Sequence, residues 1–167
     1  MTVPSQPEGC AIDPRNGTLY IGEEAGGVWR FPAGSTAGNI VASFDNAHLV
    51  ADLEGLALVP EGEEGGWLYA SSQGDNTYMR YSLPDMLPAG RFRIASGKFG
   101  STEETDGIEV KTGNFGPNFP DGIFVAQDGQ NGVGAQNFKL FRLDEIEASL
   151  ADRPTMNRLS DDTFVTT

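Results

Sequence analysis

Three carboxylates, each followed directly by a glycine, are the residues of this sequence whose type and spacing most clearly suggest chemistry. They are Glu8, Glu54 and Asp106, and each pair precedes or opens an apolar run. Carboxylate oxygens are the ligands that hard cations such as calcium prefer. Carboxylates that lie close together also raise one another's pKa unless a cation lies among them. If the three pairs occupy equivalent places in a repeated fold, we expect them to form a ring of acids around a divalent cation.

Further polar residues fall at matched positions in the same three segments. Glu24, Gln73 and Asp128 each close the following strand-like run. Asp52 lies two residues before Glu54, and therefore on the same side of an extended strand. Acid–glycine pairs are also common in turns, so a purely structural role stays open for any one of these residues. The match across three segments favours a shared site for the set.

These acids belong to a sequence repeat. Its three copies begin near residues 8, 54 and 106, which are 46 and 52 residues apart. Each copy contains three aligned strand-like runs, at 8–12, 19–24 and 28–31, at 54–58, 68–73 and 78–81, and at 106–110, 123–128 and 138–141. A repeat of three to four strands about every 40–50 residues is typical of propeller blades. Innermost strands line the central channel of a propeller, so we expect the acids to converge on one rim.

The pattern predicts an all-β fold, namely about three consecutive blades of a β-propeller. The apolar spacing and early acids of Leu143–Leu150 predict one short helix near the C-terminus. A propeller normally closes with about four to eight blades, so residues 1–167 are interpreted as roughly half of one propeller domain. The runs broken by Gly, Pro, Asn and Asp predict strands at about 9–13, 18–22, 27–32, 40–44, 55–59, 67–72, 77–82, 91–95, 107–111, 122–127 and 138–143.

Composition excludes several classes of partner. The chain has 167 residues with 24 acidic and 11 basic side chains, and its formal net charge is −13. A nucleic-acid backbone or an anionic membrane surface would repel such a chain. No apolar run approaches the roughly 18 residues of a membrane span, and the first residues lack the basic and apolar regions of a signal peptide. Divalent cations remain as natural partners of the acidic side chains.

Four other residues are predicted to be structural. Cys10 and His48 are each the only residue of their type. A lone cysteine excludes a disulfide within the chain, and its apolar surroundings predict a buried thiol. His48, beside an apolar run, is interpreted as a satisfied structural histidine. Arg30 and Arg80 fall on matched third strands and are interpreted as outward, solubilising positions.

Seven short motifs occur in one order along the chain, and their combination is specific although each is weak alone. They are Glu8-Gly9-Cys10, Leu19-Tyr20-Ile21-Gly22-Glu23-Glu24, Asp52-Leu53-Glu54-Gly55-Leu56, Ser71-Ser72-Gln73-Gly74-Asp75-Asn76, Thr105-Asp106-Gly107-Ile108, Phe124-Val125-Ala126-Gln127-Asp128-Gly129 and Gln136-Asn137-Phe138-Lys139. With these motifs the chain resembles the β-propeller phytases over about residues 7–147.

This resemblance implies a six-bladed ring and calcium-dependent hydrolysis of phytate (myo-inositol hexakisphosphate), in a family that is usually secreted. It implies that calcium neutralises the phosphates of calcium-phytate and activates a water molecule, which attacks phosphorus in line without a covalent enzyme intermediate. By the match, the catalytic carboxylates are Glu8, Glu24, Asp52, Glu54 and Asp106. The calcium ligands in the cleft are these five residues together with Gln73.

The sequence departs from the family pattern in two places. Family members have more of the propeller before the segment that matches Glu8, and that part carries the Lys, Arg and Tyr residues that hold substrate phosphates. A second, structural calcium site of the family would retain only Asp128 and Asn131 here, because Gly100 and Gln130 stand where the family has acids. We therefore expect the second site to be weakened or absent.

Three hypotheses are open for the chain as a whole. In the first, it is the C-terminal half of a calcium-dependent phytase and has little or no activity alone, because the phosphate-holding residues and a closed ring are missing. In the second, it is a non-catalytic calcium- or phytate-binding module, two copies of which assemble into one ring. In the third, it belongs to another calcium-dependent propeller hydrolase, such as a lactonase, although the Ser-Ser-Gln-Gly and Asn-Phe-Lys motifs disfavour this.

Overall fold

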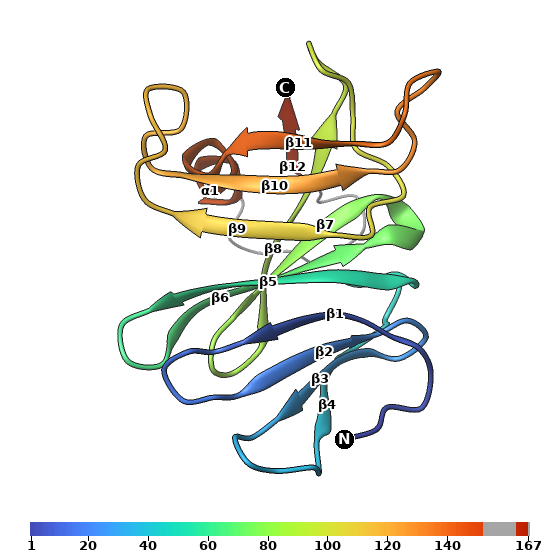
Figure 1. Ribbon diagram of the computed structural model, residues 1–167, viewed down its shortest axis with the longest axis vertical. Helices are drawn as coiled ribbons and strands as arrows, with labels where there is room; N and C mark the ends of the chain where they lie inside the picture. Colours follow the sequence, from blue (N-terminus) through green and yellow to red (C-terminus); the bar gives the residue numbers. More distant parts are fainter. Residues whose placement is uncertain (152–162, 167) are drawn as a thin grey trace.

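Alternation of apolar and polar residues, interrupted by glycine-containing turns, folds most of this chain into antiparallel hairpins (Figure 1). The computed structural model describes residues 1–151 and 163–166. The first sheet contains β1 (Pro7–Ile12), β2 (Leu19–Glu23), β3 (Gly27–Phe31) and β4 (Asn39–Ser43). The middle sheet contains β5 (Leu53–Glu61), β6 (Gly65–Ser72), β7 (Thr77–Ser82) and β8 (Leu87–Ala95). The third contains β9 (Ile108–Thr112), β10 (Gly122–Asp128) and β11 (Asn137–Arg142).

The predicted all-β class with three repeated sheets and one short helix is confirmed. Each predicted strand overlaps an observed one, and the helix is α1 (Leu143–Ala151). One short 3₁₀ helix, η1 (Gln73–Asp75), follows β6. A further strand that the sequence did not predict, β12 (Thr163–Thr166), pairs in parallel with β8 at the outer edge of the middle sheet. The predicted domain, 1–167, includes residues 152–162 and 167, which lie outside the described residues.

The three sheets are arranged so that their first strands lie beside one another. β5 of the middle sheet contacts β1 on one side and β9 on the other (Figure 1). The middle sheet therefore has a neighbour on both faces, whereas the first and third sheets each have a neighbour on one face only. This arrangement creates two cores, one at each junction.

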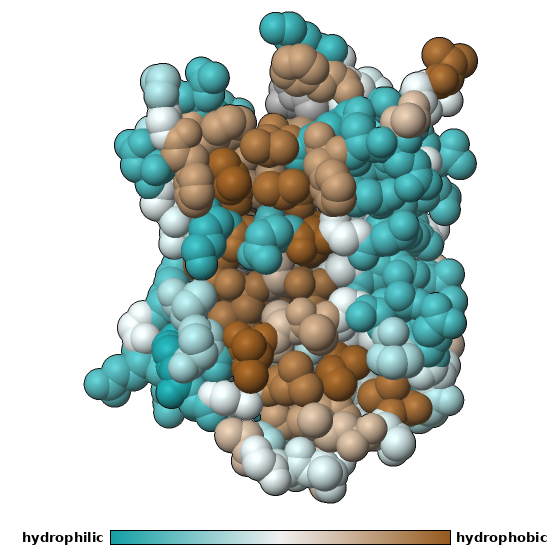
Figure 2. Space-filling model, viewed as in Figure 1, coloured by the Kyte–Doolittle hydropathy of each residue, from teal (hydrophilic) through white to brown (hydrophobic). Residues whose placement is uncertain are grey.

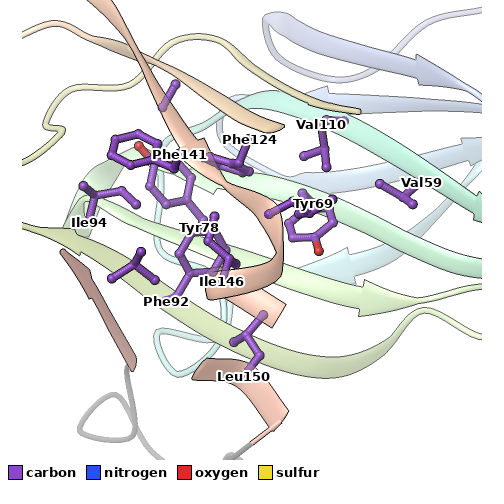
Figure 3. Close-up of a cluster of buried hydrophobic side chains, with 14 residues drawn as sticks. Val59, Tyr69, Tyr78, Phe92, Ile94, Val110, Phe124, Phe141, Ile146 and Leu150 are labelled. Atoms are coloured by element: carbon purple, nitrogen blue, oxygen red, sulfur yellow. The ribbon is translucent and has the colours of Figure 1, made fainter. Parts of the chain in front are cut away.

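The core between the middle and third sheets is rich in aromatic side chains (Figure 3). Tyr78 and Phe92 of the middle sheet both contact Phe124 of β10 edge to face, with ring centroids 5.0 and 5.3 Å apart. Edge-to-face geometry matches the positive ring edge to the negative ring face. Ile146 and Leu150 of α1 complete this core from one end. The core between the first and middle sheets is mainly aliphatic and includes Leu53, Leu68 and Met79.

The helix α1 also explains why Arg80 is buried. The Arg80 guanidinium pairs with Glu147 of α1 and lies 4.2 Å from the centroid of the Trp67 ring. The interpretation of Arg80 as an outward, solubilising residue is therefore wrong, because the helix covers this end of the middle sheet. Arg30 is only half-buried, but it also donates across the first junction, to the backbone oxygen of Pro84 (3.1 Å).

The prediction that Cys10 is buried is also wrong, because its side chain is exposed. Side chains alternate between the two faces of a strand, and the neighbouring Ala11 packs against the core between the first and middle sheets. Cys10 therefore faces away from that core, on the uncovered side of the first sheet. His48, in contrast, is structural as predicted, since its Nδ1 lies 2.6 Å from the Asp45 carboxylate.

In the described ranges of the chain, no helix has the length and apolar character needed to cross a membrane.

Candidate active site

The predicted site residues lie at one edge of the sheets. β1, β5 and β9 begin at this edge, and their antiparallel neighbours β2, β6 and β10 end there. In Figure 1 this edge is at the right, where Figure 2 shows a mainly hydrophilic surface. We call it the acidic rim. Its members are Glu8 in β1, Glu24 after β2, Asp52 before β5, Glu54 in β5, Gln73 in η1 and Asp106 before β9.

Glycines after the rim acids allow the first strands to approach one another closely. A Cβ atom on Gly9 would lie 2.4 Å from the backbone oxygen of Glu54. A Cβ atom on Gly55 would lie 2.7 Å from the backbone nitrogen of Ile108. Any side chain at these positions would push the strands apart. The pairing of an acid with a glycine therefore has a physical cause. Because the glycine allows two first strands to approach closely, the acid that precedes it lies near the acid at the start of the next sheet.

Hydrogen bonds connect the rim residues across sheets. Gln73 Nε2 donates to Asp106 Oδ1 at 2.8 Å and so joins the middle sheet to the third. The Asp106 backbone N–H donates to Gln127 Oε1 at 2.8 Å, which fixes the start of β9 against the end of β10. At the first junction, the Leu53 N–H donates to the backbone oxygen of Glu24 at 3.3 Å. Gln127 is a positioning residue that the sequence reasoning did not identify.

Glu54 lies at the electrostatic centre of the rim. Its side chain is only 9% exposed, and burial raises its pKa. The carboxylates of Glu8, Asp106, Asp52 and Glu24 raise it further, to about 7. The five acids predicted to act together are thus close enough to influence one another. At neutral pH, Glu54 is poised between its protonated and ionised forms.

The rim side chains are of the type that binds calcium, but they are spread apart. Five carboxylates and one amide offer the oxygen atoms that calcium prefers, and the mutual repulsion that raises the Glu54 pKa would be relieved by a cation. Among the described residues, however, no three Asp, Glu, His or Cys side chains are grouped closely enough to hold one metal ion. The rim therefore fits a cation by charge and ligand type, whereas a closed coordination shell is not formed by these side chains alone.

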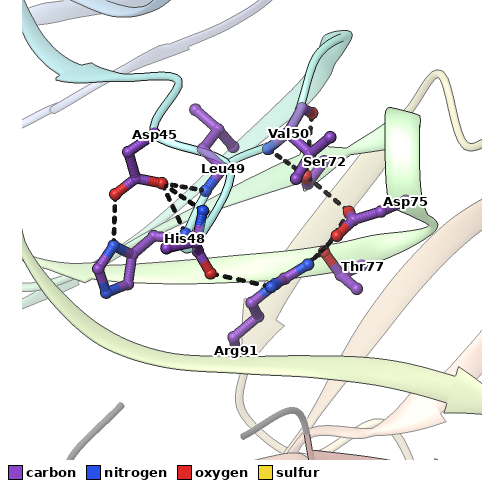
Figure 4. A network of polar contacts seen from close by, with 9 residues as sticks. Asp45, His48, Leu49, Val50, Ser72, Asp75, Thr77 and Arg91 are labelled. Atoms are coloured by element: carbon purple, nitrogen blue, oxygen red, sulfur yellow. Dashed lines mark hydrogen bonds and ion pairs between the residues drawn. The ribbon is translucent and has the colours of Figure 1, made fainter. Parts of the chain in front are cut away.

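A polar network behind the rim holds the segment that leads into Asp52 (Figure 4). The Asp45 carboxylate accepts backbone N–H bonds from Ala47 (2.9 Å) and His48 (2.7 Å) as well as the contact with the His48 ring. These bonds hold the pKa of Asp45 well below its usual range. Ser72 Oγ contacts both the N–H (2.9 Å) and the carbonyl oxygen (3.0 Å) of Val50.

Arg91 of β8 joins this segment to η1 (Figure 4). Its side chain is completely buried and pairs with the Asp75 carboxylate. It also donates to the backbone oxygen of Ala47 (2.9 Å) and to Thr77 Oγ1 (3.1 Å). Because η1 begins with Gln73 and the segment ends at Asp52, this one guanidinium supports two rim residues from behind. The Ser-Ser-Gln-Gly-Asp motif contained Asp75, but sequence alone gave no sign of its partner.

The structure does not bring Asp128 and Asn131 into the acidic rim. Asp128 is buried, and its carboxylate accepts a 2.6 Å bond from Lys139 Nζ and a 3.1 Å bond from the Glu103 N–H. Lys139 also donates to the backbone oxygen of Ser101 at 2.6 Å. Asn131 Nδ2 donates to Ala135 within its own turn. The ammonium group of Lys139 therefore supplies the positive charge that Asp128 would otherwise take from a metal ion.

Comparison with known proteins gives two concordant matches. The family model described as Phytase matches residues 1–163. A curated relative, 3-phytase from Bacillus subtilis (strain 168), is 39% identical over 163 residues, an alignment that covers 92% of this chain and 43% of the relative. The chain thus spans less than half the length of that relative. The family match extends over nearly the whole chain, including all six rim residues, and the chain therefore belongs to the phytase family.

Proposed function

We propose that this chain forms the acidic, calcium-binding side of a phytase active site, and that its three sheets are consecutive blades of a six-bladed propeller. The observation that carries the proposal is the convergence of acids from all three sheets around Glu54. The family match supports phytate as the substrate. An extracellular location stays a prediction of the family resemblance.

The acidic rim can bind a polyanion only with a cation between them. Phytate carries many phosphate charges, and the four charges that act most strongly on Glu54 are all carboxylates. Calcium, when bound, would supply the positive charge that binds phosphate and lowers the pKa of a water molecule. The rim carboxylates would hold that charge in place, and the cation would in turn relieve the repulsion that raises the pKa of Glu54 and so favour its ionised form.

The chain alone is expected to have little phytase activity. It corresponds to 43% of the length of the B. subtilis relative, and the phosphate-holding Lys, Arg and Tyr residues are expected in the part that it does not match. A non-catalytic module would bind calcium or phytate equally well, so binding by itself does not distinguish the two functions.

A domain exchange tests the proposal. This chain would replace the matching segment of the B. subtilis relative, and phosphate release from phytate would be measured with calcium chloride and with a chelator. We expect calcium-dependent release from the chimera. Glu54→Gln and Asp106→Asn should each lower the rate strongly, whereas Glu63→Gln, an exposed acid in the β5–β6 turn, should not.

Three results would contradict the proposal. A folded chimera without phosphate release would favour the non-catalytic binding module, and release that is equal in the Glu54→Gln and Glu63→Gln variants would show that the rim is not the active site. Hydrolysis of a lactone instead of phytate would favour the lactonase interpretation.

A further inference from the structure

Residues 101–106, which lead from the middle sheet into β9, are bonded to both of the sheets that they connect. The Glu104 N–H donates to Asn76 Oδ1, just before β7, at 2.9 Å, and the Glu103 N–H donates to Asp128 Oδ1 at the end of β10 at 3.1 Å. Glu104 has a φ of 49°, a left-handed backbone that is unfavourable for a residue with a Cβ atom. Strained residues of this kind persist where the surrounding structure fixes them, and they cluster at functional sites.

Three buried hydroxyl groups meet in the interior next to this segment. The Tyr78 hydroxyl of β7 lies 2.7 Å from Thr102 Oγ1 and 2.8 Å from Thr105 Oγ1, and the three residues are at most 3% exposed. A tyrosine hydroxyl has one proton, so it can donate to only one threonine and accepts a bond from the other. Buried hydroxyl groups need such partners because they are removed from water. Tyr78 therefore fixes two points of the segment to the middle sheet.

The peptide unit between Thr105 and Asp106 is held from two sides. Its carbonyl oxygen accepts a bond of 2.9 Å from Ser71 Oγ of the middle sheet, and its N–H donates to Gln127 Oε1 of the third sheet at 2.8 Å. A peptide unit is planar, so these two bonds set the orientation of the whole unit. The contact of Tyr78 with the Thr105 side chain adds a third point of attachment. The backbone that carries the Asp106 carboxylate is therefore fixed before the side chain reaches the rim.

We propose that Tyr78 is a positioning residue of the acidic rim: its hydroxyl holds Thr105, and Thr105 holds the Asp106 carboxylate where the cation and the substrate phosphate would bind. The role of Asp106 in this proposal rests on the proposed function, whereas the contacts of Tyr78 do not. Tyr78 is 1% exposed, so it acts through Thr105 and not by contact with a ligand. Its ring packs against Phe92 and Phe124, with ring centroids 5.1 and 5.0 Å apart, and close packing of this kind keeps the hydroxyl in place.

Tyr69 offers a matched control within the same core (Figure 3). It is also fully buried, but its hydroxyl donates to the Glu147 carboxylate of α1, which lies at the opposite edge of the sheets from the rim (Figure 1). Tyr69→Phe and Tyr78→Phe each remove one hydrogen-bonded hydroxyl and keep the ring, so both should lower Tm by about 2–6 °C. Only Tyr78→Phe should also loosen Asp106.

Hydrogen exchange of backbone amides, followed by NMR in the complete chain, tests the proposal. The Asp106 N–H should exchange about tenfold faster in Tyr78→Phe than in Tyr69→Phe, and the comparison of the two variants removes the effect of a general loss of stability. Thr105→Val should act like Tyr78→Phe, whereas Thr105→Ser, which keeps a hydroxyl, should retain the wild-type rate. Adding Tyr78→Phe to Thr105→Val should change the rate little further, because the two residues act through one bond.

The chimera with the B. subtilis relative supplies the functional readout. Tyr78→Phe should lower kcat/KM for phytate about tenfold, and Tyr69→Phe should leave it unchanged. Equal exchange rates of the Asp106 N–H in the two variants overturn the positioning role, and so do equal values of kcat/KM. A wild-type chimera that releases no phosphate contradicts the proposed function instead, and the exchange rates then still decide whether Tyr78 fixes Asp106.

Discussion

Single glycines set the distances within the acidic rim. Because a Cβ atom on Gly55 would lie 2.7 Å from the backbone of Ile108, we expect Gly55→Ala to destabilise the chain by about 1–3 kcal/mol, as overpacking of a close contact does. Urea unfolding measures this change. Gly107→Ala, made at the equivalent position of the third sheet, is the control and should change stability by less than about 0.5 kcal/mol. Equal losses in the two variants would mean that strand spacing does not depend on Gly55.

Glu54 makes the stability of the folded chain depend on pH. Its pKa is raised from 4.5 to about 7 in the folded protein. The folded chain therefore binds more protons than the unfolded chain between these values, so this contribution is fully present below about pH 4.5 and is lost as pH rises through about 7. Carboxyls with lowered pKa values, such as Asp13 and Asp45, act in the opposite direction and only at lower pH.

We expect the free energy of unfolding, measured without divalent cations, to fall between about pH 5 and pH 7. The Glu54→Gln variant should lose most of this slope, because its side chain does not titrate, and the Glu63→Gln variant should keep it. A slope that is unchanged in Glu54→Gln would show that other groups carry the pH dependence.

At the scale of elements, the Asp75–Arg91 pair attaches η1 to β8. Arg91 is completely buried, so we expect Asp75→Asn to cost about 3–5 kcal/mol, because the guanidinium keeps its charge in the interior while its carboxylate partner is neutralised. Asp144→Asn is the matched control. Its partner Arg142 is 39% exposed, and exposed pairs contribute about 0–1 kcal/mol. Urea unfolding compares the two, and a cost for Asp75→Asn no larger than that for Asp144→Asn would contradict the structural role of the pair.

Most elements could be predicted from the sequence because local signals mark them. Hairpins with Asn16-Gly17 and Gly26-Gly27 turns are set by neighbouring residues. β8 was predicted to begin at residue 91 but begins at Leu87. Pro and Gly were taken to interrupt strands, whereas a shift in the pairing with β7 accommodates Pro88 and Gly90 within the strand. β12 was not predicted because it pairs in parallel with β8, a strand that is distant from it in the sequence. Such a pairing needs no tight turn between the two strands, so no local sequence signal indicates it.

The candidate site was predictable to the extent that it follows the repeat. Equivalent positions in three sheets converge, so Glu8, Glu54 and Asp106 could be grouped from spacing alone. The exceptions depend on contacts between segments without repeat symmetry. Asp128 occupies a matched position, yet Lys139 binds its carboxylate. The network around Arg91 joins three separate segments, and no spacing rule connects them.

At the scale of the whole molecule, the excess of acids should make stability respond to calcium more than to salt in general. Monovalent salt screens the repulsion among the surface charges, whereas calcium should also bind at the acidic rim. A ligand present at about a hundred times its dissociation constant stabilises the folded state by about 2.7 kcal/mol. One kcal/mol raises Tm by about 2–4 °C in a chain of this size. We therefore expect calcium chloride to raise Tm by several degrees more than sodium chloride at equal ionic strength.

Variants show which residues cause this extra rise of Tm in calcium chloride. Glu54→Gln and Asp106→Asn should reduce the extra rise of Tm in calcium chloride, because each removes one carboxylate of the rim. Glu63→Gln should retain it, and so should Asp128→Asn, since Lys139 already neutralises that carboxylate. If calcium chloride and sodium chloride raise Tm equally at matched ionic strength, the rim of the isolated chain does not bind calcium. If Asp128→Asn removes the extra rise of Tm in calcium chloride, the ion binds at the third sheet instead.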